Sequence, residues 1–302
     1  MILLALLGCV PGLPDVDEPC EPWDEPGLYQ IKVEMPDGPK RRAYVWVPTA
    51  AGPRDMVVAL HGGASSPTDL ADVSQYMRVA ENEGFVAVFP QGRGDLVNLW
   101  NGGSCCGSSQ DDRRDVDDVA FLERLVRELS PKVCGRRVLG TGFSNGGMLA
   151  HRWACEGSRI DAVVPVSGPL AIPEARCEGP PVPIRHYHGT ADSRVPYDGG
   201  SGDGYSSTEH RSVEETMETW RRRNLCADTA PQTQVDGDTV CQAWSCQAAT
   251  ELCSVEGWGH AWPGGRNSDR TSADATRDGW EWFQGLVPPT TDDIPPADSG
   301  RD

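Results

Sequence analysis

A serine flanked by glycines lies between an apolar segment and a helical one in the stretch VLGTGFSNGGMLA (138–150). The pattern Gly-x-Ser-x-Gly is formed by Gly142, Ser144 and Gly146. A serine on a sharp turn between a strand and a helix exposes its hydroxyl near a helix N-terminus, so this context is typical of a nucleophile elbow. The pattern alone is weak, because a chain rich in glycine and serine can produce it by chance. The prediction that Ser144 is a nucleophile therefore depends on whether the chain also supplies a base and an acid.

The base is expected to be a histidine late in the chain, because the order on such a fold is serine, acid, histidine. His260 lies in EGWGHAWPGG (256–265), a strand end followed by a glycine-rich loop, which suits a catalytic histidine. The alternative is a loop histidine that packs on Trp258 or Trp262. The other histidines after Ser144 are less suitable, since they fall inside predicted helices or strands: His151, His186, His188 and His210.

The acid that orients the base is predicted at Asp192. It follows an apolar strand in HYHGTADSRVPY (186–197), and loops that follow strands carry the chemistry of α/β folds. The alternative is an aspartate that caps a turn or a helix, which is common for this residue.

Two backbone N–H groups are predicted to form an oxyanion hole. One is the N–H of Asn145, directly after the nucleophile, and the other is the N–H of Gly63 in ALHGGAS (59–65). The alternative for Gly63 is an ordinary glycine turn.

The segments that must position these residues alternate between strand and helix. An opening antiparallel hairpin is predicted over 28–48, with its turn at PDGP. Strands alternating with helices predict an α/β fold with a mainly parallel central sheet covered by helices on both faces. The further strands are expected at 55–63, 84–92, 136–144, 161–169 and 183–192, and the helices at 68–83, 115–129, 209–223 and 276–286, besides the helix after Ser144.

Composition sets the class of protein. The chain has 302 residues, 38% of them hydrophobic, and a formal net charge of −18, which argues against binding to nucleic acid. One catalytic domain is expected over 27–287, preceded by an extended tether at 10–26 and followed by a disordered tail at 288–302, both rich in proline and acidic residues. Nothing in the motifs requires a metal or another cofactor, and a monomer is expected.

The N-terminal segment and the cysteines indicate export. MILLALLGC (1–9) resembles a lipoprotein signal in which Cys9 receives the lipid, although no basic residue precedes the short apolar run. A plain secretory signal, a frayed terminus and a mis-assigned start are the alternatives. The chain has eleven cysteines, and the ten left after Cys9 favour disulfides in an oxidising compartment over a zinc site.

Six motifs together resemble the secreted esterase family that includes polyhydroxybutyrate depolymerases and feruloyl esterases, with acetyl xylan esterases as relatives. The resemblance implies an α/β-hydrolase fold and ester hydrolysis through an acyl-enzyme, with the nucleophile at Ser144, the acid at Asp192 and the base at His260. The motifs are ALHGG, WNGGSCCG (100–107), DDVAFL (117–122), GFSNGGMLAHRWAC (142–155), HGTADSRVPY (188–197) and GWGHAWPGG (257–265).

The resemblance also bears on substrate binding and disulfides. It suggests that Trp100 and Trp262 border the substrate pocket, with packing in the core as the alternative. Cys226 and Cys246 resemble the late cysteine pair of the family, and Cys241 and Cys253 could face each other across two neighbouring strands, although sequence does not fix connectivity.

We expect an extracytoplasmic serine carboxylesterase that acts on a small molecule, an oligosaccharide ester or a short oligoester. Membrane association is expected only through the N-terminal lipid. A serine peptidase of the same fold, a non-catalytic binding lipoprotein and an acyltransferase are the alternatives.

Overall fold

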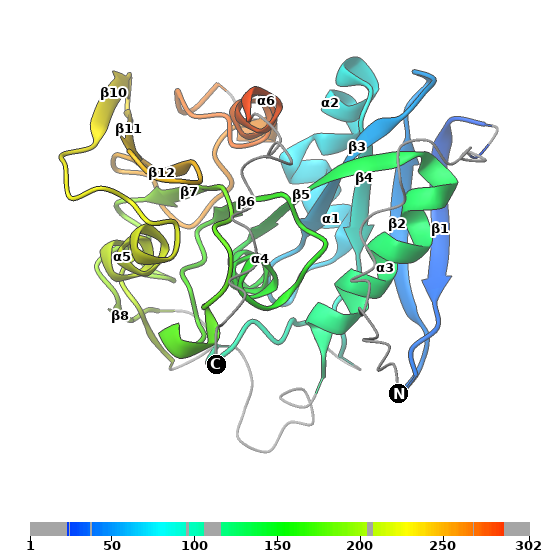
Figure 1. Cartoon of the computed structure of the whole chain (residues 1–302), viewed down its shortest axis with the longest axis horizontal. Coiled ribbons are helices and arrows are strands. Elements are labelled where there is room, and N and C mark those ends of the chain that lie inside the picture. Colours follow the sequence, from blue (N-terminus) through cyan, green and yellow to red (C-terminus); the bar gives the residue numbers. More distant parts are fainter. Residues whose placement is uncertain are drawn as a thin grey trace, which may run out of the picture.

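A ten-stranded sheet forms the centre of the molecule in the computed structural model, which describes residues 23, 25–36, 38–94, 97–105, 116–203, 208–267 and 269–286. The strands lie in the order β1-β2-β4-β3-β5-β6-β7-β12-β11-β10 (Figure 1). The pairs from β4 to β12 are parallel, and the pairs at both ends of the sheet are antiparallel. The strands are β1 (Gly27–Val33), β2 (Arg41–Val47), β3 (Arg54–Leu60), β4 (Val86–Pro90), β5 (Gly135–Phe143), β6 (Ala162–Val166), β7 (Ile184–Gly189), β10 (Gln232–Asp236), β11 (Thr239–Trp244) and β12 (Thr250–Val255), while β8 (Gly200–Ser201) and β9 (Glu209–His210) form a separate pair.

Helices cover both faces of this sheet, as the alternating pattern predicts. One face packs against α3 and α4, and the other packs against α1, α2 and α6 (Figure 1). The helix α5 contributes Trp220 to the first of these cores. The helices are α1 (Pro67–Ser74), α2 (Tyr76–Glu83), α3 (Asp118–Val133), α4 (Asn145–Glu156), α5 (Val213–Arg223) and α6 (Arg277–Gly285).

The central strands are buried on both faces, which explains their continuous apolar runs. All seven residues of β3 are buried. Because successive side chains of a strand point to opposite faces, Val58 and Leu60 enter one core while Val57 and Ala59 enter the other. The edge strand β1 instead alternates between exposed and partly buried residues.

Two predicted helices have different limits in the structure. The segment 68–83 is two helices, because Gln75 takes a left-handed conformation with φ of 61° and ends α1 before α2 begins. The prediction that His210 opens a helix is wrong, since His210 ends β9. The helix begins at Val213, where Ser212 and Glu215 form a capping box that satisfies backbone N–H groups of the first turn.

Both predicted disulfides are present. Cys226 is bonded to Cys246, and Cys241 is bonded to Cys253 at directly opposed positions of β11 and β12.

A third disulfide, Cys155–Cys177, joins the end of α4 to a short 3₁₀ turn at Glu174–Arg176 and was not predicted. Cys105 and Cys134 each take part in a disulfide as well. Three parts of the sequence lie outside the described residues: Cys9, the predicted lipidation site; Cys106, which follows Cys105; and the predicted tail at 288–302.

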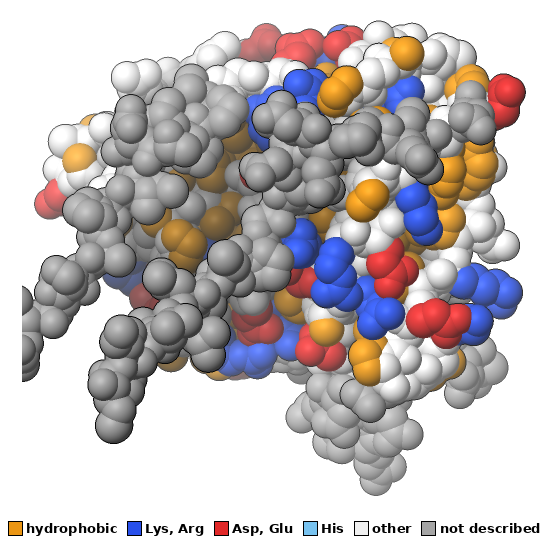
Figure 2. Space-filling model, turned by 45° about the vertical axis from the view of Figure 1, so that its right-hand side comes forward, with side chains coloured by type: hydrophobic (Ala, Val, Ile, Leu, Met, Phe, Trp, Pro, Cys, Tyr) orange, Lys and Arg blue, Asp and Glu red, His pale blue; other side chains and the backbone are white. Residues whose placement is uncertain are grey.

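The predicted tether at 10–26 lies largely outside the described residues, but its end contacts the domain. Trp23 stacks on Tyr29 with ring centroids 4.3 Å apart and donates its backbone N–H to the carbonyl of Lys132. On the face shown in Figure 2, lysine and arginine side chains are interspersed with aspartate and glutamate. None of the described helices is both long and apolar enough to cross a membrane.

Candidate active site

Ser144 occupies a strained turn between β5 and α4. Its φ is 54° and its ψ is −119°, a conformation that costs a serine free energy and occurs where surrounding structure imposes it. The glycines on each side leave no room for a side chain: a Cβ on Gly142 would lie 2.4 Å from the carbonyl oxygen of Gly146, and one on Gly146 would lie 2.2 Å from that of Leu60. Ser144 is only partly buried. Ser144 therefore lies on a sharp, strained turn between a strand and a helix, as the sequence predicts.

Asp192 and His260 form a hydrogen-bonded pair at the same edge of the sheet. Asp192 follows β7 and His260 follows β12, two strands that pair in parallel. The Nδ1 atom of His260 lies 2.7 Å from Oδ2 of Asp192. The other carboxylate oxygen accepts the backbone N–H groups of Arg194 and Val195, each at 2.9 Å. Burial alone would raise the pKa of Asp192, but hydrogen bonds from His188, His260 and the backbone outweigh it and hold the pKa well below its usual range.

The ring of His260 packs beside the elbow. Its centroid lies 4.8 Å from that of Phe143, the residue before Ser144, so its main ring contact is neither Trp258 nor Trp262. Between the described side chains of Ser144 and His260 no hydrogen bond is formed in this conformation. Such bonds commonly tighten only when substrate is bound.

The two predicted oxyanion donors lie close together. A Cβ on Gly63 would be 3.6 Å from Cβ of Asn145, and one on Gly62 would be 3.7 Å from Cβ of Ser144, so the loop after β3 lies against the elbow. Within the described part of the chain, neither the N–H of Gly63 nor that of Asn145 has a backbone or side-chain acceptor. Two free donors beside a serine are suited to a developing oxyanion.

His61 fixes the backbone of the loop after β3, a role that the sequence analysis missed. Its Nε2 accepts the N–H of Gly92 at 3.0 Å, so the proton is on Nδ1, which donates to the carbonyl of Gly62 at 2.7 Å. The side chain is fully buried, and this burial lowers the pKa of His61 to about 4. A neutral ring with one defined tautomer therefore holds the glycine loop in place. The available signal was the position of His61 directly before two glycines.

Trp100 and Trp262 are buried, which favours the packing alternative over direct contact with substrate. Their exposed fractions are 2% and 1%. The indole N–H of Trp100 donates to the carbonyl of His61, and that of Trp262 donates to the hydroxyl of Thr276. The side-chain amide of Asn145 makes two hydrogen bonds to the backbone of Trp100, at 2.8 and 3.0 Å. Trp100 therefore joins the loop after β3 to the first residue of α4.

A buried ion pair anchors the segment that carries Trp100. Arg41 and Asp118 are 5% and 1% exposed and lie 2.7 Å apart. The second oxygen of Asp118 accepts the backbone N–H of Asn101 at 2.7 Å, and Arg152 donates to the carbonyl of Asn101 at 2.8 Å. Asp118 belongs to the motif DDVAFL, but its partner is 77 residues away and was not predicted.

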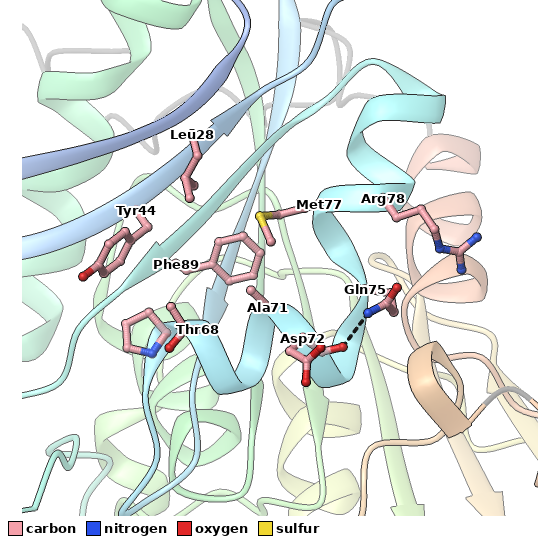
Figure 3. Close-up of a pocket in the computed structure, with 10 residues that line it drawn as sticks. Leu28, Tyr44, Thr68, Ala71, Asp72, Gln75, Met77, Arg78 and Phe89 are labelled. Carbon is pink, nitrogen blue, oxygen red and sulfur yellow. Dashed lines mark hydrogen bonds between the residues drawn. The ribbon is translucent and has the colours of Figure 1, made fainter.

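A cavity of about 270 Å³ lies elsewhere on the molecule. Figure 3 shows it between β1, β2, β4, α1 and α2, with Leu28, Tyr44, Met77 and Phe89 on its walls and Asp72 and Arg78 at its rim. No residue of the candidate site lines it. Among the residues that the structure describes, no cluster of histidine, cysteine or acidic side chains is arranged to hold a metal ion.

Comparison with known proteins gives esterases as relatives. The chain is 27% identical over 218 residues to feruloyl esterase B of Piromyces equi, which covers 68% of this chain and 39% of that protein. It is 28% identical over 164 residues to the bifunctional acetylxylan esterase/xylanase XynS20E of Neocallimastix patriciarum, covering 53% of this chain and 22% of that protein. A putative esterase, NocK of Nocardia uniformis subsp. tsuyamanensis, is 29% identical over 235 residues, 70% of this chain and 66% of that protein. The chain thus spans less than half of the first two relatives. No family model matches the chain.

Solved structures establish the fold. Acetyl xylan esterase from Aspergillus awamori superposes with a TM-score of 0.62 at 17% identity, covering 85% of this chain and 99% of that one. Esterase 2 of Thermogutta terrifontis gives a TM-score of 0.59 at 17% identity, covering 89% of this chain and 97% of that one. The chain has the α/β-hydrolase fold, as the sequence predicts.

Proposed function

We propose that the protein is a serine carboxylesterase in which Ser144 is the nucleophile, His260 the base and Asp192 the orienting acid. The observation that carries this proposal is the 2.7 Å hydrogen bond between His260 and Asp192, 68 residues apart in sequence, at the sheet edge where Ser144 occupies its strained turn. The esterase relatives support the same activity.

The tautomer of His260 follows from its partner. Because the carboxylate of Asp192 only accepts hydrogen bonds, Nδ1 of His260 carries the proton and Nε2 is free to take one. Nε2 removes the proton of the Ser144 hydroxyl as Oγ bonds to the ester carbonyl carbon. The N–H groups of Gly63 and Asn145 stabilise the oxyanion. His260 then protonates the leaving alcohol, and a water activated by the same imidazole releases the acid from Ser144.

The proposed substrates are feruloyl or acetyl esters of plant polysaccharide fragments. Two of the relatives bear those activities in their names, a feruloyl esterase and an acetylxylan esterase. A short hydroxyalkanoate ester, which the resemblance to polyhydroxybutyrate depolymerases suggests, is the alternative. Comparing kcat/KM for methyl ferulate, acetylated xylo-oligosaccharide and a hydroxybutyrate oligomer separates these classes.

We further propose that the protein works outside the cytoplasm. The disulfides Cys155–Cys177, Cys226–Cys246 and Cys241–Cys253 support an oxidising compartment. From the lipoprotein-like segment at 1–9, we also propose that a lipid on Cys9 attaches the protein to a membrane. Globomycin-sensitive processing and mass spectrometry of the mature N-terminus test it.

The esterase proposal is tested by Ser144→Ala with Ser201→Ala, an exposed serine of β8, as the matched control. With p-nitrophenyl acetate, Ser144→Ala is expected to lower kcat by about ten-thousandfold or more, while the control keeps its activity. A fluorophosphonate should label wild type once, at Ser144. Near-wild-type turnover by Ser144→Ala would refute the proposal. Faster cleavage of an aryl amide than of the matching ester would indicate a peptidase, and transfer to added glycerol would indicate an acyltransferase.

A further inference from the structure

Three histidines outside the proposed triad are buried in a row behind Asp192. His151 lies on α4, and His186 and His188 lie on β7. Their exposed fractions are 0%, 0% and 1%. The mechanism above uses none of them. A buried imidazole must have hydrogen-bond partners for its ring nitrogens, and here the rings partner one another.

The contacts form one continuous chain from α5 to the Asp192 turn. The indole N–H of Trp220 donates to Nδ1 of His151 at 2.9 Å. Nε2 of His151 lies 3.2 Å from Nδ1 of His186, and Nε2 of His186 lies 3.2 Å from Nδ1 of His188. Nε2 of His188 lies 2.8 Å from the carbonyl oxygen of Val195 and 3.4 Å from Oδ2 of Asp192.

Both ends of the chain impose the same direction on its protons. An indole N–H can only donate, so Nδ1 of His151 must accept and its Nε2 carries the proton. That proton is donated to His186, which in turn donates to His188. At the other end, a carbonyl and a carboxylate can only accept, so Nε2 of His188 must also carry a proton. Every ring is then neutral, with the proton on Nε2.

Burial supports the neutral state of the first two rings. It lowers the pKa of His151 to about 3 and that of His186 well below its usual value. The groups facing the chain include Arg211, whose charge further disfavours protonation of His151. Tyr197 meets the ring of His188 edge-on. His210 and His260 lie on the Asp192 side.

We propose that the chain Trp220–His151–His186–His188 is a directional hydrogen-bond relay that makes His188 a positioning residue for the Asp192–His260 pair. The Nε2–H of His188 donates to the carbonyl oxygen of Val195, and the backbone N–H of Val195 donates to Oδ1 of Asp192. The same N–H faces Oδ2, the oxygen that binds His260. Because Nδ1 of His188 accepts from His186, the proton of the His188 ring lies on Nε2, where it is directed at Val195 and Asp192. The inference rests on the proposed function only in treating that pair as catalytic.

The tautomers are measured on the wild-type protein by long-range ¹H–¹⁵N spectra after ¹⁵N-histidine labelling. The whole protein contains six histidines, and single His→Gln variants assign their signals. At pH 7, His151, His186 and His188 are expected as Nε2–H tautomers whose Nδ1 carries no proton. An Nδ1–H tautomer for any of the three overturns the proposal.

His186→Leu removes the middle ring of the hydrogen-bonded series and leaves Nδ1 of His188 without a donor. We expect the ¹⁵N shifts of the His188 ring nitrogens to change, and kcat to fall about ten- to a hundredfold with little change in KM. His186→Gln, which can accept and donate, should restore most of the activity. Tyr187→Leu is the matched control, because this neighbour is equally buried but points into the opposite core. It should lower stability without changing the ¹⁵N shifts of the His188 ring.

A His186→Leu enzyme with wild-type kcat and unchanged ¹⁵N shifts of His188 also overturns the proposal. If that variant does not fold, the wild-type spectra decide. Failure of the proposed function is a separate result: an active Ser144→Ala enzyme would refute the esterase mechanism while leaving the tautomers as predicted.

Discussion

The imidazole of His260 and the carboxylate of Asp192 are joined by a 2.7 Å hydrogen bond between Nδ1 and Oδ2. This contact orders two loops that follow neighbouring parallel strands, β7 and β12. It also leaves Nε2 as the nitrogen of His260 that is free to act as the base in the proposed mechanism.

Asp192→Asn should retain the fold and lose turnover. An amide can donate to Nδ1, which favours the wrong tautomer of His260, so we expect kcat on p-nitrophenyl acetate to fall by roughly a thousand- to ten-thousandfold. KM should change little, because the side chain of Asp192 is buried and acts through His260. Asp203→Asn serves as the control. Among the described residues, the exposed side chain of Asp203 accepts a hydrogen bond only from the hydroxyl of Ser193, and its backbone N–H donates to the Ser193 carbonyl. Equal activity of both variants would contradict the assignment of the acid.

Asn145→Ala separates the backbone donor of Asn145 from its side chain. The N–H remains, so the oxyanion donor is kept, but the two hydrogen bonds to the backbone of Trp100 are lost. We expect the free energy of unfolding to fall by about 2 kcal/mol, because two buried backbone groups lose their partners. The loss in kcat should be much smaller than that of Ser144→Ala. Urea unfolding and steady-state kinetics measure the two effects, and a loss of kcat as large as that of Ser144→Ala would contradict this division of roles.

Gly63→Ala tests the loop after β3. A Cβ on Gly63 would lie 2.9 Å from Cδ2 of Leu99, the end of a side chain that can turn aside, and 3.6 Å from Cβ of Asn145 beside the elbow. The backbone N–H is kept, so we expect kcat to fall by less than the roughly hundredfold effect of losing one oxyanion donor. Gly285→Ala is the control, because a Cβ there meets no atom within 4 Å. A loss of kcat of a hundredfold or more would contradict this expectation and show that the methyl group displaces the loop from the elbow.

Stability should fall on mild acidification because of buried neutral histidines. Burial lowers the pKa of His151 from 6.5 to about 3, so below pH 6.5 the unfolded chain binds a proton there that the folded chain does not. The free energy of unfolding therefore decreases as pH falls from 6.5 toward 3, by up to about 1.4 kcal/mol per pH unit for this residue. Urea unfolding at several pH values should give a shallower dependence for His151→Gln than for wild type. Parallel curves would contradict a buried neutral His151.

The disulfide Cys241–Cys253 should stabilise the antiparallel end of the sheet. It closes a loop with a sequence separation of 12, for which chain entropy predicts a contribution of about 3 kcal/mol. Replacing both cysteines with alanine should lower the free energy of unfolding by that amount and leave KM unchanged. A large loss of kcat without a loss of stability would show that β11 and β12 act on the site directly.

Sequence predicted the residues whose chemistry depends on local pattern and chain order. Ser144 is identified by glycines two positions away on each side, and Asp192 and His260 by their places at the ends of strands. The helix break at Gln75 was missed because the apolar period continues through it, while the backbone turns to a left-handed conformation.

Contacts between distant segments carried no readable signal. Arg41 and Asp118 pair across 77 residues, and His151 meets His186 across 35. Each partner alone has the appearance of an ordinary surface charge or core histidine. Only the packing of α3 and α4 on the sheet brings these side chains together, so their roles could not be assigned before the topology was known.

The parallel pairing of β12 with β7 has a consequence for how the protein acquires its activity. Thr250 pairs with Ile184, so this step joins segments 66 residues apart, and long-range parallel pairings form slowly. A fragment that ends before β12 lacks His260 and cannot bring its imidazole to the serine turn, however well its remaining strands assemble. Return of hydrolysis after dilution from denaturant would therefore report completion of the sheet, later than fluorescence changes from tryptophans buried around α3 and α4.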